Sequence, residues 1–198
     1  LLAMMLLLDS YIAPVLFMVS IGMAILYNMG SNIFLGEISY ITKAIAAVLQ
    51  LGVTMDYSIF LWHSYMEKLD SGLKEDDAMA EAIDATLVSV TGSSATTIAG
   101  FLALCFMTYT MGRDLGIVMA KGVVFGVIAS VTILPVLLLR FNKLVQKTRH
   151  RSLIPDMTKM AHGLTGRYGI YIAIFCVLIG PAIYGYNHQN IVYDFTKM

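Results

Sequence analysis

The sequence predicts an all-α membrane protein, a polytopic bundle of transmembrane helices. Three observations lead to this fold class. First, 58% of the 198 residues are hydrophobic and only 13% are charged, whereas soluble domains carry about 25% charged residues. Second, the mean hydropathy is +0.76, and a water-soluble fold of this size has no interior large enough to bury so much apolar surface. Third, the apolar residues gather in runs of about 20, the length that crosses a bilayer as a helix.

Five apolar stretches are long enough to span a membrane, and a sixth is shorter. The run Leu1 to Leu8 is too short and is interpreted as the end of an earlier span, so we expect the chain to be an excerpt of a longer protein. The complete spans are expected at Tyr11 to Met29, Ile41 to His63, Leu87 to Tyr109, Gly116 to Leu139 and Tyr168 to Tyr186.

The charges of the connections predict the orientation of the spans. The segment after the fourth complete span holds seven of the thirteen basic residues and one acid, Asp156. Cytoplasmic loops carry an excess of lysine and arginine, so this segment is expected in the cytoplasm. Alternation then places loop 64–86 in the cytoplasm too, and loops 30–40 and 110–115 and the tail from Asn187 outside.

Two connections carry patterns of their own. Within loop 64–86, turn formers and acids at Ser71 to Asp77 suit the start of a helix, and apolar residues then recur every four positions. An amphipathic helix over about 64–86 on the inner membrane surface, running into the third complete span, is expected, with a solvated connector as the alternative. The basic segment 140–166 contains Pro155 and is interpreted as a cytoplasmic linker between two bundles.

Asp56 is the residue that most needs an explanation, because it lies deep in the second complete span. A carboxylate at membrane depth costs at least about 2.5–3.5 kcal/mol, so it must face protein or water and not lipid. A carboxyl group in such a place can take up a proton from one side and release it to the other. The alternative is a structural acid that holds two helices together. Tyr57, the next residue, could hydrogen-bond a neighbouring span or simply pack.

The third complete span carries hydroxyl side chains at the depth of Asp56. At a rise of about 1.5 Å per residue, they lie roughly 9–15 Å from the inner boundary, against roughly 10 Å for Asp56. Hydroxyl groups donate and accept, so they could connect Asp56 to water. Close helix packing by small residues is the alternative. The residues are Ser93, Ser94, Thr96 and Thr97.

Three further polar residues lie in or at the ends of the spans. Lys43 is thirteen residues from Asp56, about 20 Å along the helix and on nearly the opposite face, and is expected at the outer interface with its ammonium group in water. Lys121 lies near the outer side of the fourth span, where Asp56 is a strained partner; a partner from a helix outside the chain stays open. His63 is expected to be an interfacial histidine, and a proton-entry role is the less favoured interpretation.

Several functional classes are disfavoured. The sequence contains no HExxH, GxSxG, P-loop or GxGxxG motif, so no enzyme activity and no cofactor are expected. Cys105 and Cys176 lie in apolar runs without metal-ligand spacing, so neither a disulfide nor a metal site is expected. The formal net charge is zero, which gives no basic field for nucleic acid.

The segment Gly52-Val-Thr-Met-Asp-Tyr-Ser-Ile-Phe60 resembles the Asp-Tyr motif in the fourth transmembrane helix of the MMPL branch of the RND superfamily. The amino-acid sequence around this motif is most similar in character to that of Gram-positive members. Further pieces resemble the family in the same order along essentially the whole chain. They are Ala82-Ile-Asp-Ala-Thr86, Ser89, Thr96-Thr97, Gly100-Phe-Leu-Ala-Leu104, Gly112 to Gly116, Gly122 and Thr132-Ile-Leu-Pro-Val-Leu-Leu138.

The resemblance implies an RND/MMPL bundle, a type shared with sterol-sensing domains. Residues 1–139 would form the first-half bundle, from the end of helix 2 through helices 3–6, and 140–166 the cytoplasmic linker. Residues 167–186 would be helix 7, and 187–198 would open the second extracytoplasmic porter domain. Asp56 and Tyr57 would be half of the proton-translocating centre, with a second Asp-Tyr pair beyond the chain. Lys43 and Lys121 are not general family features.

The implied function is a secondary transporter of the bacterial cell membrane, driven by the proton motive force and exporting lipids or amphiphilic compounds. The alternatives are a lipid-binding regulatory domain like the sterol-sensing domains, or a protein-export auxiliary of the same superfamily. The expected partners are the lipid bilayer, protons, a hydrophobic or amphiphilic substrate and the remaining half of the same polypeptide. A homo-oligomer is left open.

Overall fold

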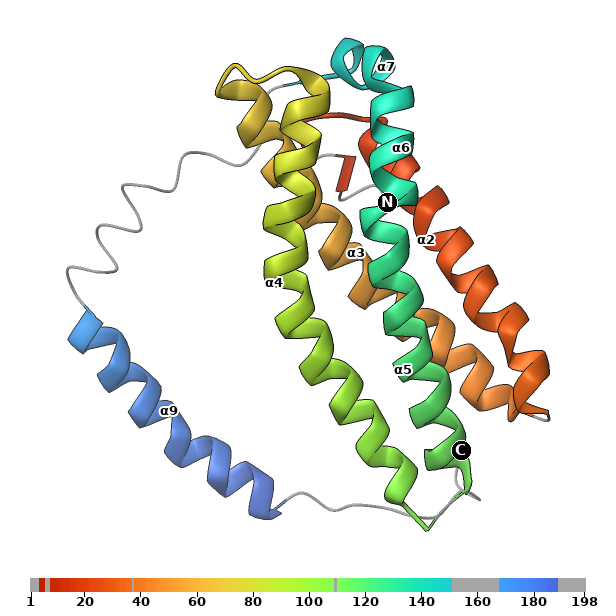
Figure 1. Ribbon diagram of the computed structural model, residues 1–198. Helices are drawn as coiled ribbons and strands as arrows, with labels where there is room; N and C mark the ends of the chain where they lie inside the picture. Colours follow the sequence, from red (N-terminus) through yellow and green to blue (C-terminus); the bar gives the residue numbers. More distant parts are fainter. Residues whose placement is uncertain (1–3, 6–7, 37, 109, 151–167, 189–198) are drawn as a thin grey trace. The chain divides into compact units, whose positions relative to one another are not determined.

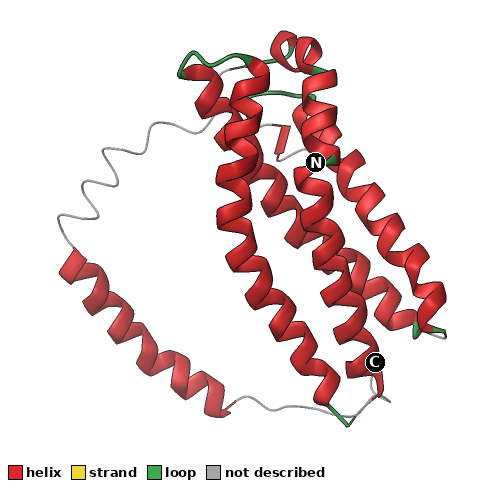
Figure 2. Cartoon of the chain, in the orientation of Figure 1, coloured by secondary structure: helices red, strands yellow, loops and turns green. Residues whose placement is uncertain are grey.

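The computed structural model describes residues 4–5, 8–36, 38–108, 110–150 and 168–188. Two units are described separately, Leu1–Leu153 and Ile154–Met198. Helices make up nearly all of the described residues, and five of the helical stretches are long and apolar enough to cross a membrane. The all-α membrane fold class is thereby confirmed (Figure 2).

The first unit is a bundle whose long helices are connected by short turns (Figure 1). Helix α5 contacts α2, α3 and α4, and α3 contacts α2 and α4. The helices, in chain order, are α2 (Ala13–Gly30), the 3-10 helix η1 (Ser31–Leu35), α3 (Tyr40–Asp70), α4 (Glu75–Ala103), the 3-10 helix η2 (Leu104–Phe106), α5 (Thr110–Val131), α6 (Ile133–Arg140) and α7 (Asn142–Lys147).

The segment expected to hold an amphipathic helix that runs into the third complete span is divided between two helices. Helix α3 continues past its expected end at His63 to Asp70, and α4 begins at Glu75 and runs unbroken into the next span. The break falls at Ser71 and Gly72, where glycine adopts a positive φ of 93° that other residues rarely tolerate. The expected surface helix is therefore the first part of one long membrane helix.

The expected outer loop 110–115 is helical, because α5 begins at Thr110. Glycine allows α5 to approach the end of α4 closely at this turn. A Cβ at Gly116 would lie 2.5 Å from the backbone oxygen of Phe101, and one at Gly112 would lie 3.0 Å from the Met107 sulfur. The two glycines therefore allow the start of α5 to pack against the end of α4.

The main hydrophobic core lies toward the α3–α4 turn. Phe17 of α2 and Leu61, Trp62 and Tyr65 of α3 are fully buried there, and Phe17 packs edge-on against Trp62 with ring centroids 6.2 Å apart. Large aromatic side chains bury much apolar area at little entropic cost. This core holds α3 against α2 between the level of Asp56 and the α3–α4 turn.

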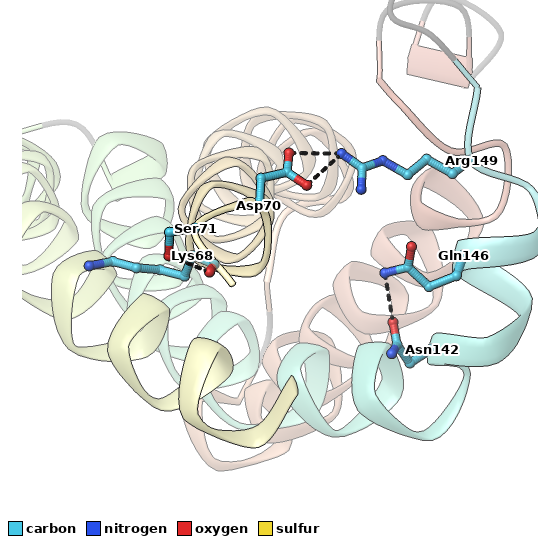
Figure 3. A network of polar contacts seen from close by, with 6 residues as sticks. All are labelled: Lys68, Asp70, Ser71, Asn142, Gln146 and Arg149. Atoms are coloured by element: carbon cyan, nitrogen blue, oxygen red, sulfur yellow. Dashed lines mark hydrogen bonds and ion pairs between the residues drawn. The ribbon is translucent and has the colours of Figure 1, made fainter. Parts of the chain in front are cut away.

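Polar contacts connect the segments at the same end of the bundle (Figure 3). Arg149 donates two hydrogen bonds to the carboxylate of Asp70, at 2.8 and 3.0 Å, and this bonding raises the pKa of the Arg149 guanidinium. The Lys68 ammonium forms an ion pair with Glu81 at 2.7 Å. The start of the interpreted linker, up to residue 150, is thus attached to the end of α3. The rest of the linker, 151–166, lies outside the described residues.

The second unit contributes one described helix, α9 (Tyr168–His188). Its 21 residues would extend roughly 32 Å, which matches the hydrocarbon core of a bilayer at about 30 Å. Its bounds agree with the span expected at Tyr168 to Tyr186. The tail expected to open a porter domain lies, from residue 189 onward, outside the described residues.

Candidate functional site: a polar pocket at membrane depth

Asp56 lines a pocket between α3 and α4. The pocket has a volume of about 400 Å³. Helical spacing explains its composition, because positions three and four residues apart share one helix face. Four residues of α3 and four of α4 line it: Val53, Asp56, Tyr57, Phe60, Ser89, Val90, Ser93 and Thr97.

Asp56 lies on an exposed side of α3. Among the described residues its carboxylate has no ion pair and no hydrogen bond, and neither Lys43 nor Lys121 pairs with it. Acyl chains are not an acceptable neighbour for a carboxylate at this depth. The open side of the pocket therefore requires polar protein or water.

Tyr57 forms the inner wall of the pocket. Its side chain is 6% exposed and packs against Val90 of α4 and Val123 of α5. The ring of Tyr57 therefore lies where α3 contacts both α4 and α5. Of the two roles that the sequence left open, packing is the one observed; among the described residues the Tyr57 hydroxyl has no hydrogen bond to a neighbouring span, and its side chain also lines the pocket.

Only some of the expected hydroxyl groups reach the pocket. Ser93 and Thr97 line it, and Ser89, one turn earlier on the same face, was missed. Ser94 is instead buried elsewhere and bonds to Thr91, while the exposed Thr96 bonds to the backbone of Ser93. A four-residue spacing of 89, 93 and 97 was the signal that could have separated these groups.

Ser93 and Thr97 keep capacity to bind water. Each hydroxyl donates to its own helix, Ser93 to the Val90 oxygen at 3.1 Å and Thr97 to the Ser93 oxygen at 2.9 Å. A hydroxyl that donates once still has two acceptor lone pairs. The α4 side of the pocket therefore presents acceptors that a water molecule or a protonated carboxyl group can use.

The remaining expected site residues lie away from this pocket. Lys43 is exposed in the first turn of α3 and lines a separate pocket of about 280 Å³ at the α2–α3 end. His63 is exposed, two turns before the end of α3. Lys121 is half-buried, and its ammonium group donates to the backbone oxygen of Asn28 at 3.1 Å and to the side-chain oxygen of Asn32. The partner that the sequence left open for Lys121 therefore lies within the chain, on α2 and η1.

A buried polar set was missed by the sequence analysis. Asn28 of α2 and Gln50, Thr54 and Ser58 of α3 are at most 1% exposed, and they face away from the pocket toward α2 and α5. On α3 these residues recur every fourth position, so one side of a membrane helix is polar. That periodicity was the available signal.

The comparisons with known proteins agree with this architecture. The family model described as "MMPL family" matches residues 1–158. The membrane protein ActII-3 of Streptomyces coelicolor is 32% identical over 162 residues, which is 76% of this chain and 22% of that protein. The membrane protein MJ1562 of Methanocaldococcus jannaschii is 39% identical over 88 residues, 44% of this chain and 23% of that protein.

The membrane protein YdfJ of Bacillus subtilis is 24% identical over 120 residues, 61% of this chain and 16% of that protein. The chain thus spans about a fifth of the length of these curated relatives. No solved structure matches significantly.

Proposed function

The chain belongs to the MMPL family of transporter-type membrane proteins, and on that premise we propose that it is the first-half proton-handling bundle of an exporter driven by the proton motive force. The proposed cargo is a lipid or another amphiphilic compound, and the proposed location is the cell membrane of a bacterium. The observation that supports the proposal is the pocket in which Asp56, Tyr57 and three hydroxyl side chains lie together at membrane depth.

The proposed role of Asp56 follows from the difference between its two protonation states. The charged carboxylate needs hydrogen-bond donors or water around it, whereas the neutral acid can be buried at much lower cost. Proton binding would therefore favour closure of the pocket, and proton release would favour its hydration. Two states with different proton affinity are what couples proton flow to a conformational change.

Tyr57 and the α4 hydroxyls would carry the proton to and from the carboxyl group. Tyr57 can donate to the carboxylate, and Ser93 and Thr97 can accept from water or from the protonated acid. The proton leaves to water on the opposite side in the second state. Because the transferred proton carries a positive charge, the direction of this step follows the whole proton motive force, the pH gradient together with the membrane potential.

The rest of the polypeptide would complete the site. The open side of the pocket needs polar cover, and the match covers only about a fifth of the length of the curated relatives. We propose that the second half supplies that cover, including the second Asp-Tyr pair that the family resemblance implies. Substrate handling is assigned to extracytoplasmic parts beyond the described residues.

Replacement of Asp56 tests the proposal. In the full-length protein reconstituted in liposomes, Asp56→Asn should abolish export of a fluorescent phospholipid driven by a pH gradient, because an amide cannot cycle a proton. The variant should still insert, since the amide has the size of the carboxylate.

The matched control is Asp84→Asn, which makes the same chemical change at an exposed position of α4 outside the pocket. That variant should transport normally. Gradient-driven export by Asp56→Asn at the parent rate would refute the assignment.

A further inference from the structure

A polar seam joins α2, α3 and α5 on the side of α3 that faces away from the pocket. It consists of Asn28, Gln50 and Thr54, which are 0%, 0% and 1% exposed, together with Gly122 and Gly126. The Asn28 amide donates to the Gln50 side-chain oxygen at 2.7 Å and to the Val118 backbone oxygen at 3.3 Å. Three helices are therefore bonded together at one level of the membrane.

The two glycines of α5 fit this seam closely. A Cβ at Gly122 would lie 2.7 Å from the Asn28 amide nitrogen and 3.0 Å from the Gln50 oxygen, and a Cβ at Gly126 would lie 2.5 Å from the Thr54 hydroxyl. Gln50 and Thr54 are one helical turn apart, as are the two glycines. The seam therefore fixes both the distance and the register between α3 and α5.

Packing alone does not require these polar side chains. The Gln50 amide nitrogen, the Thr54 hydroxyl and the Asn28 side-chain oxygen are buried without a hydrogen-bond partner among the described residues. Apolar side chains could fill a helix contact without unpaired polar atoms, which are rare in native interiors. The seam thus gives up some stability to hold a particular geometry.

A direct packing path leads from the seam to the pocket. Val123 and Val127 each follow one of the glycines on α5, and both belong to the apolar cluster around Tyr57. Thr54 and Asp56 are two residues apart, so their side chains lie about 200° apart around α3. Any rotation or outward shift of α3 at the seam is therefore transmitted to Tyr57 and Asp56.

We propose that Thr54, Gly122 and Gly126 are positioning residues for the proton site. They hold α3 at the rotation and distance from α5 that place Asp56 and Tyr57 toward the α4 hydroxyls. This inference rests on the proposed function of Asp56, and it adds that residues on the opposite face of the helix set the proton affinity of the site.

Titration of the Asp56 carboxyl group tests the inference without a transported substrate. The full-length protein is studied in lipid nanodiscs by infrared spectroscopy, and the carboxyl band of Asp56 is identified as the one lost in Asp56→Asn. Gly126→Ala should displace α3 and shift the titration midpoint by about 0.5 pH unit or more, because hydration and hydrogen bonding of a carboxyl group set its proton affinity. The control Gly22→Ala adds the same methyl group to α2, where nothing lies within 4 Å of the new Cβ, and should leave the midpoint unchanged.

A compensating variant separates positioning from general damage. Thr54→Ala removes the hydroxyl that would collide with the new methyl group, so the double variant Thr54→Ala/Gly126→Ala should insert normally and return the midpoint toward the parent value. An unchanged midpoint in Gly126→Ala overturns the inference, as does a double variant that shifts as far as the single one or fails to insert.

The inference and the proposed function fail in different ways. If Asp56→Asn removes no titrating band and still transports, the proposed function fails, and the inference fails with it. If Asp56 titrates and is required for transport but the seam variants match the parent, only the positioning role is wrong.

Discussion

Lys121 shows how this bundle accommodates a charge within a membrane span. Its ammonium group donates to the Asn28 backbone oxygen, in the last turn of α2, and to the Asn32 side chain just beyond that turn. The carboxyl end of a helix carries partial negative charge, so a cation is favourable there. Lys121 therefore joins α5 to the end of α2.

Removal of that charge should weaken the bundle. Lys121→Met keeps most of the apolar stem and loses both hydrogen bonds, so we expect a loss of about 1–3 kcal/mol, the usual range for buried polar groups left unpaired. The loss is measured from the denaturant midpoint of the purified protein in micelles. Lys43→Met is the control, since Lys43 is exposed and should change little; equal effects of the two substitutions would contradict this account.

At the scale of single residues, the sequence predicted how deep a residue lies in the membrane better than it predicted which side of its helix the residue occupies. Asp56 and Tyr57 stood out because a carboxylate is costly in a membrane, and depth along the helix brought Ser93 and Thr97 to the same pocket. Ser94 and Thr96 share that depth but lie on other sides of α4, which a rise per residue does not reveal. The partners of Lys121 could not be predicted, because Asn28 and Asn32 are about ninety positions away and only the fold brings them near.

Helix α4 begins with three consecutive acids. Glu75, Asp76 and Asp77 occupy its first turn, directly after the turn at Gly72. Negative charge at the amino end of a helix offsets the partial positive charge of the helix dipole and of its free N–H groups. The acids therefore stabilise the polar first turns of α4, which precede its apolar span.

Neutralisation of these acids should loosen the start of α4. In the triple variant Glu75→Gln/Asp76→Asn/Asp77→Asn, we expect a loss of about 1–2 kcal/mol from contributions of roughly 0.3–1 kcal/mol each. Amide hydrogen exchange of residues 78–82, the first whose N–H groups are bonded within the helix, should then be roughly 5- to 30-fold faster at low salt, and the difference should shrink as salt is added. Exchange rates equal to the parent at low salt would rule out this role for the acids.

Hydropathy located every span but not every helix end. The last turns of α3 and the first turns of α4 are polar, so they carry no apolar signal even though they are helical. The start of α5 was missed for the same reason, because the charged Arg113 and Asp114 precede its apolar run. The close approach of Gly112 and Gly116 to the end of α4 becomes visible only when the neighbouring helix is in place.

At the scale of the whole molecule, charge contacts gather at one end of the bundle. Asp70 with Arg149 and Lys68 with Glu81 join the end of α3 to the segment that follows α7 and to α4. Exposed ion pairs contribute little stability each, typically less than about 1 kcal/mol. Their common location agrees with a water-facing end, and the prediction from the charges of the connections is that this end faces the cytoplasm.

Cysteine labelling of intact cells tests this orientation. In a background of Cys105→Ala and Cys176→Ala, a membrane-impermeant maleimide should label Ile33→Cys, because that exposed residue of η1 is expected outside. Lys74→Cys, in the α3–α4 turn, should react only after the cells are opened. The reverse pattern would invert the bundle and the direction of proton flow assigned to it.

The sequence could not show what covers the pocket. The class, the spans and the Asp-Tyr pair follow from local pattern and from the family resemblance. What lies against the exposed side of Asp56 does not follow from local pattern, and the matches cover only about a fifth of the length of the curated relatives.

Helices α3 and α4, with 31 and 29 residues, are longer than a bilayer is thick. They extend roughly 47 and 44 Å, against about 30 Å for the hydrocarbon layer, so their joined tip stands clear of the acyl chains. If the two helices tilt as one unit about the level of Asp56, the tip moves farther than the pocket. A small tilt caused by protonation would then become a larger displacement at the tip, where a pair of dyes could follow individual turnovers.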